Sequence, residues 1–321
     1  MTLKLHARRL VAAIPHSSRQ ALALDPAAAL AQQFDVRVVP VEELRESRGA
    51  GGWCDGLSFT TDQIVCYAPS RGSRRQNFTL LHELGHILVN EDDAALDWLS
   101  DRPDPDRDQE RLCDAIAAEI LLPEPTINQV LAGAAPTVDH LRQLHASSQA
   151  SEEVCAIALA ARLPVRGAFV LIRRRTATVA FAASSGWPPL RIPRGLAVPA
   201  RHPLRDLGTR QRWIGWVTPD LRLAFTGHPA ASPPSYHAEN LLQVDAVAGP
   251  RRTTAILLDT SGAGSDIKGD PDETYALDPK LWPTQPGYTC SKCGNNAASG
   301  SYECDECGVG PCRACGRCRC F

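Results

Sequence analysis

The 321-residue chain has almost no excess charge and no long apolar run. Its formal net charge is −2 at pH 7, which excludes a uniformly basic nucleic-acid-binding protein. No stretch approaches the roughly 20 consecutive apolar residues that a membrane-spanning helix needs. The apolar run Leu10–Ile14 is too short for the core of a signal peptide, and no convincing cleavage site follows it. We therefore expect a cytoplasmic protein with no membrane partner.

The chain also lacks the even spread of cysteines that a disulfide scaffold needs. Of its 12 cysteines, four are scattered through the first half, and the others are crowded between Cys290 and Cys320. In a reducing cytoplasm, such a crowded cluster binds metal more often than it forms disulfides. The alternative, a set of disulfides, requires an oxidising compartment.

The candidate metal-binding and catalytic residues lie in the stretch Phe78–His86, which reads Phe-Thr-Leu-Leu-His-Glu-Leu-Gly-His. The apolar residues in it recur at helical spacing, which predicts a helix. Residues four apart on a helix share a face, so His82 and His86 can direct two imidazoles at one zinc ion. Glu83 lies one step round the helix, where it can accept a proton from a metal-bound water that attacks a carbonyl. The alternative is two ordinary histidines on a surface or core helix, and a third ligand would decide against it.

A second predicted helix, which begins at Glu110 and is ended by Pro123, supplies candidates for that ligand. Its acidic residues are Glu110, Asp114 and Glu119. Glu110 and Asp114 are four residues apart and share a face, whereas Glu119 lies on another side. Spacing alone favours Glu110 or Asp114 and does not choose between them.

The two motifs together are similar to a known family. Phe-Thr-Leu-x-His-Glu-x-Gly-His, followed by Glu-x-x-Cys-Asp-x-x-Ala-Ala-Glu-Ile-Leu-Leu-Pro, resembles the ImmA/IrrE metallopeptidases. The resemblance implies a zincin-like, gluzincin-type domain in which His82, His86 and Glu110 bind one catalytic Zn²⁺. It also implies that Glu83 is the general base.

Three positions depart from the usual pattern of that family. Asp114 stands where the family usually has Asn, Asn77 where an Arg often precedes the Phe, and Tyr67 where an Asn often closes the preceding strand. These departures leave the metal ligands intact and concern the positioning of the substrate.

An acidic segment separates the two motifs. We interpret it mainly as a solvated loop, because Pro103 and Pro105 interrupt it. A second interpretation is a negative rim on the active-site cleft that attracts a basic substrate.

Residues 126–163 are predicted to form a helix-turn-helix-like unit, with helices at Thr137–His145 and Ser151–Leu163; the family resemblance implies the same. A DNA-recognition helix usually begins with Arg, Lys, Asn or Gln, whereas the second of these begins with Glu152 and Glu153. We expect a structural or substrate-docking role, and the sequence leaves direct DNA binding open.

Residues 164–260 change to a β pattern rich in arginine, with a hairpin predicted around Arg173–Arg175. The arginines indicate either a solvated basic face or a site for an anionic ligand, nucleic acid or acidic partner. Some ImmA/IrrE proteins carry a GAF-like sensor domain here, and Val198–Pro203 and Val244–Ala246 resemble it. Strands are predicted at Ala168–Ile172, Thr176–Ala182, Trp213–Val217, Leu221–Phe225 and Ala255–Leu258.

Residues 261–287 are rich in Gly, Pro and Asp, which is typical of a flexible linker. The tail at 288–321 contains two Cys-x-x-Cys-Gly knuckles, which predict a small zinc-ribbon-like module with one or two structural zinc ions. Such all-thiolate sites are closed and hydrolyse nothing. The thiolates, whose pairing with zinc the sequence does not fix, are those of Cys290, Cys293, Cys304, Cys307, Cys312, Cys315, Cys318 and Cys320.

The sequence therefore predicts an α+β protein with a metallopeptidase domain at 1–125, followed by the four segments just described. Its predicted function is that of a zinc metallo-endopeptidase. The family resemblance implies a protein substrate, a helix-turn-helix transcriptional repressor, whose cleavage releases stress-response or mobile-element genes. The alternative is a regulatory protein that binds a partner or nucleic acid on a peptidase scaffold.

Overall fold

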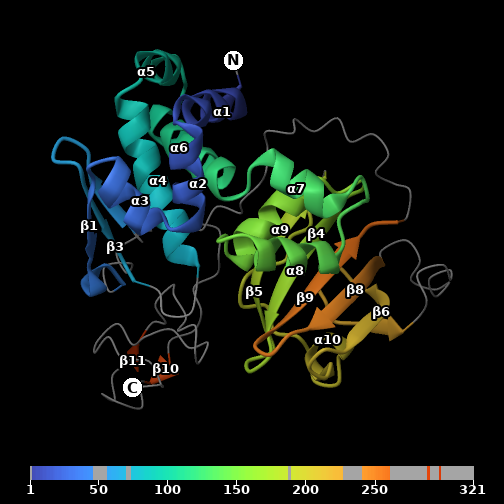
Figure 1. Cartoon of the computed structure of the whole chain (residues 1–321). Helices are drawn as coiled ribbons and strands as arrows, with labels where there is room; N and C mark the ends of the chain where they lie inside the picture. The colour runs from blue at the N-terminus through green and yellow to red at the C-terminus, as the bar shows by residue number, and fades with distance from the viewer. Residues whose placement is uncertain are drawn as a thin grey trace. The chain divides into compact units, whose positions relative to one another are not determined.

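The computed structural model describes residues 2–45, 56–69, 74–186, 189–226 and 241–260, together with the paired short strands β10 (Tyr288–Thr289) and β11 (Asn296–Ala297). The mixture of helices and sheets confirms the α+β class (Figure 1). The chain divides into two compact units. The first runs to Ile127 and takes in His145–Ser151, and the second holds Asn128–Leu144 and continues from Glu152. The predicted linker and all eight tail cysteines lie outside the described residues.

The first unit combines helices with a small sheet. In the sheet, β3 lies between β1, to which it is parallel, and β2, to which it is antiparallel. β2 was not predicted, whereas β3 is the strand that Tyr67 closes before the first motif. The elements are α1 (Leu3–Ala13), α2 (His16–Leu24), α3 (Pro26–Gln33), β1 (Arg37–Pro40), the 3₁₀ helix η1 (Glu42–Arg45), β2 (Gly56–Phe59), β3 (Ile64–Tyr67), α4 (Arg75–Asn90), α5 (Asp93–Ser100) and α6 (Pro105–Leu121).

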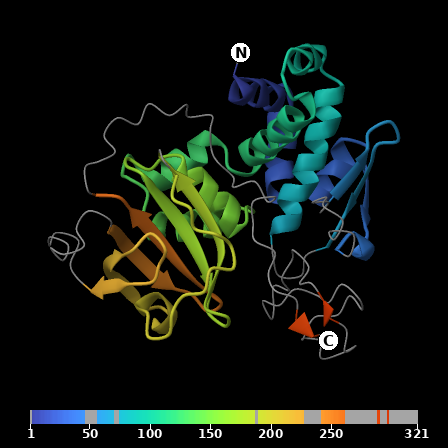
Figure 2. The ribbon, with the colours of Figure 1, turned by 180° about the vertical axis from the view of Figure 1, so that it is seen from behind.

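Helices α4 and α6 are the centre of this unit and lie side by side in both views (Figures 1 and 2). Their apolar faces are fully buried, as shown by Leu81 and Leu84 on α4 and by Leu112 on α6. The helices approach closely at Gly85, where an added Cβ would lie 2.9 Å from the Cα of Cys113. Both predicted motif helices are therefore confirmed, and glycine at position 85 allows their close contact.

The acidic segment between the motifs is not the loop that we predicted, because it contains α5 and the start of α6. Asp92 caps α5 by accepting a hydrogen bond of 2.8 Å from the backbone N–H of Ala95. Asp104 caps α6 in the same way, and Pro105 occupies the first turn, where a missing N–H costs nothing. Capping side chains explain why a run of aspartates and prolines starts helices here.

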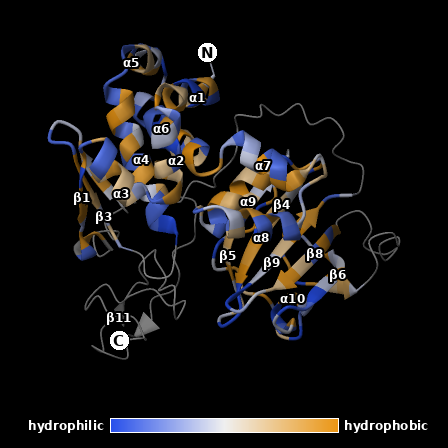
Figure 3. Ribbon diagram, in the orientation of Figure 1, coloured by the Kyte–Doolittle hydropathy of each residue, from blue (hydrophilic) through white to orange (hydrophobic). Residues whose placement is uncertain are grey.

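The second unit is built on a six-stranded antiparallel sheet in the order β5-β4-β9-β8-β6-β7. The predicted hairpin around Arg173–Arg175 is confirmed by the pairing of β4 with β5. β7 is shorter than predicted, and β8 was not assigned as a strand. The hydrophobic colour of the central strands marks the core (Figure 3). The strands are β4 (Gly167–Arg173), β5 (Thr178–Ser185), β6 (Arg212–Val217), β7 (Ala224–Thr226), β8 (Leu242–Ala248) and β9 (Arg252–Leu258), with the short helix α10 at Pro203–Asp206.

The helices that follow α6 and precede β4 are α7 (Glu124–Leu131), α8 (Val138–Ser147) and α9 (Glu152–Ala160). α9 packs on β4 and β5, and every one of its residues is buried or partly buried. Glu152 and Glu153 at its start both accept hydrogen bonds from the guanidinium of Arg252, at 3.1 and 2.7 Å. α9 therefore packs against the sheet of the second unit, and whether it binds DNA stays open.

Among the helices that the structure describes, none is both long enough and apolar enough to span a membrane.

Candidate metal centre

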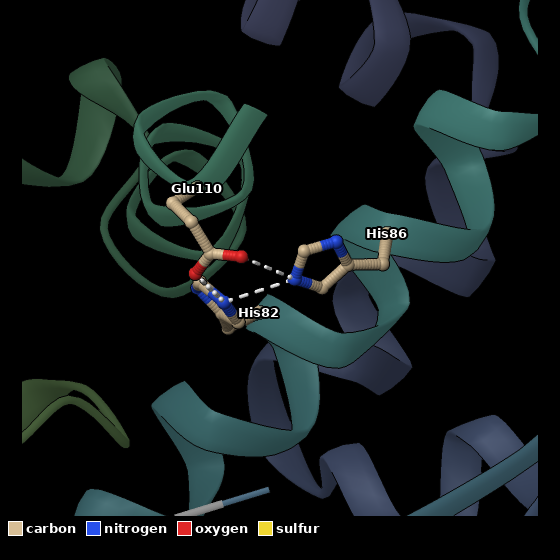
Figure 4. Close-up of side chains that lie close together, drawn as sticks. All are labelled: His82, His86 and Glu110. Atoms are coloured by element: carbon tan, nitrogen blue, oxygen red, sulfur yellow. Dashed lines mark hydrogen bonds and ion pairs between the residues drawn. The ribbon is translucent and has the colours of Figure 1, made fainter. Parts of the chain in front are cut away.

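Three side chains from the two central helices converge on one point. His82 and His86 project from α4, and Glu110 projects toward them from α6 (Figure 4). The two Nε2 atoms lie 3.2 Å apart. One carboxylate oxygen of Glu110 lies 3.3 Å from Nε2 of His82, and the other lies 3.4 Å from Nε2 of His86. The structure therefore brings together the three ligands that the family resemblance implied.

The spacing of these atoms fits a zinc ion. Zinc binds imidazole nitrogen and carboxylate oxygen at about 2.0–2.2 Å, so two ligand atoms at tetrahedral corners lie roughly 3.3 Å apart. The two Nε2 atoms are 3.2 Å apart, and each lies 3.3 or 3.4 Å from a different oxygen of Glu110, so each of these contacts is close to this value. Two histidines and a glutamate are also a donor set found at catalytic zinc sites, where the fourth position stays open. The side chain of Glu110 is 61% exposed, so the group is accessible from solvent.

Asp114, the other candidate for the third ligand, contacts His82 and not the point where the three side chains converge. Its Oδ1 lies 2.9 Å from Nδ1 of His82, on the side of the ring away from Glu110. A carboxylate behind a ligating histidine orients the ring and increases its basicity. Glu119, the third acidic candidate, is instead 3.6 Å from the guanidinium of Arg8.

The carboxylates also change the proton affinity of the histidines. Burial lowers the pKa of His82, but hydrogen bonds with Asp114 and Glu110 outweigh it and raise that pKa to about 10. Burial, followed by the charge on His82, lowers the pKa of His86. The hydrogen bond with His82 lowers the pKa of Glu110. A cation that binds here must therefore displace a proton from His82.

Glu83, the predicted general base, lies outside the group of metal-binding atoms and is 7% exposed. Its carboxylate is packed against Gly56 at the start of β2, where an added Cβ would lie 2.6 Å from Oε1. Sequence reasoning missed Gly56, because its nearness to Glu83 depends on how β2 packs against α4. A glycine at this position leaves room for the carboxylate.

Sequence reasoning also missed Gln109. Its side-chain Nε2 lies 3.3 Å from Nδ1 of His86. The available signal was its position next to Glu110 on a helix that faces α4, but that signal needs the register of the two helices. The eight tail cysteines predicted as ligands lie in the part of the chain that is not described, so their role stays a prediction.

Part of the chain is similar to known proteins. Residues 32–160 match the family model of the IrrE N-terminal-like domain, peptidase family M78. The radiation response metalloprotease IrrE of Deinococcus radiodurans is 33% identical over 117 residues, which cover 36% of this chain and 36% of that protein. The radiation response metalloprotease IrrE of Deinococcus deserti is 32% identical over 167 residues, which cover 47% of this chain and 59% of that protein. The chain thus spans less than two thirds of the length of either relative.

A solved structure, described as a Mycobacterium tuberculosis transcriptional regulator, aligns with 80% of this chain and 75% of its own. The identity is 11% and the TM-score is 0.39, which is too low to support any conclusion about fold or function.

Proposed function

Since residues 32–160 place the chain in the ImmA/IrrE family, we propose that it is a zinc-dependent endopeptidase. The observation that carries the proposal is the convergence of His82, His86 and Glu110 at separations that suit a tetrahedral zinc ion. The family match and the metalloprotease names of both relatives support the same reaction class.

Each residue of the centre then has one task. A zinc ion in the site supplies Lewis-acid polarisation of the scissile carbonyl and makes water a better nucleophile. His82, His86 and Glu110 hold the ion, and Asp114 fixes the ring of His82. Glu83 accepts the proton of the attacking water and delivers it to the amide nitrogen of the departing peptide. Because Glu83 is nearly buried, its carboxylate is held in one place for both transfers.

Replacement of Glu83 by glutamine tests this proposal. Glu83→Gln keeps the size of the side chain and removes its basicity, so zinc binding should be retained while turnover falls by about 10²–10⁴-fold. Glu91→Gln, an exposed position at the end of the same helix, is the matched control. If Glu83→Gln instead keeps the full biological activity of the protein together with metal binding, the enzyme proposal fails and the regulatory scaffold is supported.

We propose further that the substrate is a basic, DNA-binding helix-turn-helix repressor, whose cleavage releases stress-response or mobile-element genes. The family resemblance supports this class of substrate. Exposed aspartates on and between α5 and α6 would attract a basic protein; they are Asp93, Asp97, Asp101, Asp104 and Asp106. Proteomics after induction should find a repressor fragment in cells with the wild-type protein and not in cells with Glu83→Gln. Identical fragment sets in both would exclude this substrate.

The remaining parts are assigned by the same reasoning. We infer that the β-rich segment at 164–260 is a GAF-like sensor, a proposal supported by its sheet and by the resemblance of Val198–Pro203. We infer that the tail at 288–321 is a zinc-ribbon-like module, supported by its Cys-x-x-Cys spacing. Cys293→Ser should lower the zinc content of the purified chain without changing catalysis at His82 and His86. An unchanged zinc content would remove the tail proposal.

A further inference from the structure

We propose that Gln109 is a positioning residue that holds His86 in the orientation and tautomer needed to bind zinc. The inference rests on the proposed metallopeptidase function and adds a role that the sequence motifs do not contain. The observation behind it is the 3.3 Å contact between the side-chain amide of Gln109 and Nδ1 of His86.

The argument begins with the direction in which each imidazole faces. Both Nε2 atoms point at Glu110 and at each other, so Nε2 is the metal-binding nitrogen of each ring. A neutral imidazole that offers its Nε2 lone pair must carry its proton on Nδ1. Each Nδ1–H group then needs an acceptor, because a donor without one in a largely covered site costs free energy.

The chain places one polar side chain next to Nδ1 of each ring, and α6 carries both. Asp114 is the partner of His82 at 2.9 Å, and Gln109 is the partner of His86 at 3.3 Å. Glu110 lies between them in the sequence, so a single helix presents the third ligand and both supporting side chains. The rings themselves are mostly covered, with side-chain exposures of 16% for His82 and 17% for His86.

The side chains of Asp114 and Gln109 differ in whether they can donate a hydrogen bond as well as accept one. A carboxylate only accepts hydrogen bonds, whereas an amide can accept through Oε1 or donate through Nε2 after a half-turn of its end group. In the described geometry Nε2 of Gln109 lies 3.3 Å from Nδ1 of His86. When zinc is bound, the amide must present Oε1, because Nδ1 then carries the proton. Gln109 can therefore serve His86 both with and without the metal.

The contact is tested by two replacements of opposite chemistry. Gln109→Met keeps approximately the length of the side chain and removes the hydrogen bond. Gln109→Glu keeps an acceptor that cannot donate. Gln129→Met, at an exposed position on α7, is the matched control for the first change. Zinc affinity of the full chain is measured by competition with a chromophoric chelator, with His82→Ala as the baseline for zinc bound elsewhere, and thermal unfolding of the metal-free proteins checks folding.

We expect Gln109→Met to weaken zinc binding by about 10–100-fold, and Gln109→Glu to stay within about threefold of the wild type or to bind more tightly. Gln129→Met should bind as the wild type does. The rescue by glutamate separates positioning from packing, since both variants fill the same space.

Two results would overturn the inference while the proposed function stands. These are wild-type affinity in Gln109→Met, or an equal loss in Gln109→Glu. If the wild type binds no more zinc than His82→Ala, the proposed function fails and the role of Gln109 fails with it.

Discussion

The close approach of α4 and α6 at Gly85 predicts that a single methyl group there will weaken the metal centre. In Gly85→Ala, the new Cβ would lie 2.9 Å from the Cα of Cys113 and 3.0 Å from its Cβ. The first of these distances is about 0.5 Å inside the 3.4 Å at which ordinary contact begins. Because the nearest atom belongs to the backbone, the two helices must separate to relieve the overlap.

Two effects on stability oppose each other in this variant. Overpacking in a core costs about 1–3 kcal/mol. Alanine in a helix is about 1 kcal/mol more favourable than glycine. The expected net loss in the free energy of unfolding is therefore about 0–2 kcal/mol, which leaves a folded protein.

Zinc affinity should fall more than the free energy of unfolding. Glu110 comes from α6 and both histidines come from α4, so helix separation moves the third ligand away from the other two. Binding constellations tolerate displacements of only about 0.5 Å. We therefore expect zinc affinity to fall at least about tenfold, which corresponds to about 1.4 kcal/mol.

Chelator competition and thermal unfolding of the metal-free protein, measured on the same samples, check this prediction. The double variant Gly85→Ala/Cys113→Gly removes the Cβ and Sγ of Cys113 from the contact and should recover part of the affinity. Wild-type zinc affinity in Gly85→Ala would show that the helix spacing does not position Glu110, and the reasoning would be wrong.

Three further predictions follow from the first unit. Gly56→Ala places a Cβ 2.6 Å from Oε1 of Glu83, so turnover should fall while zinc content, measured by metal analysis, stays unchanged; an equal loss of both would contradict it. Asp114→Ala should weaken zinc binding by about 10–100-fold, and Asp114→Asn should weaken it less, since an amide oxygen still accepts from Nδ1 of His82; equal affinities in a competition titration would refute this. Burial lowers the pKa of His6 below its ordinary value of 6.5. As the pH is lowered below 6.5, the unfolded state therefore binds a proton before the folded state does. The free energy of unfolding then falls by at most about 1.4 kcal/mol per pH unit. In His6→Phe, denaturant unfolding below pH 6.5 should show a smaller loss of stability per pH unit than in the wild type. A slope equal to that of the wild type would exclude His6 as the cause.

The grouping of the two histidines was predictable because it follows from local spacing. His82 and His86 are one helical turn apart, and their helix is amphipathic, so a short stretch of sequence determines their geometry. The choice between Glu110 and Asp114 was different, because both lie on one face of α6. Only the register of α6 against α4 decides which carboxylate meets both Nε2 atoms, and a single sequence does not contain that register.

Other features depended on contacts between distant segments. Gln109 and Gly56 acquire their roles only when α6 and β2 are packed on α4. The helix α5 was mistaken for a loop because aspartate and proline are common in loops, yet the same residues favour the first turn of a helix. Strand β8 was not assigned, although its pattern of burial along Leu242–Ala248 is that of a strand in a covered sheet.

The division of the chain into two units has a consequence for how the first unit can be isolated or inherited. The guanidinium of Arg74, at the start of α4, donates to the backbone carbonyls of His145 and Ser148, and the amide of Asn77 donates to that of Gln149 at 3.0 Å. The segment His145–Ser151 thus belongs to the first unit, although the chain has already entered the second at Asn128. A cut after Ile127 does not leave the first unit intact, because it leaves these donors on α4 without their acceptors. Gene fusion or truncation that preserves the metal-binding helix must therefore carry the chain through residue 151, and the family match, which extends to residue 160, includes that whole segment.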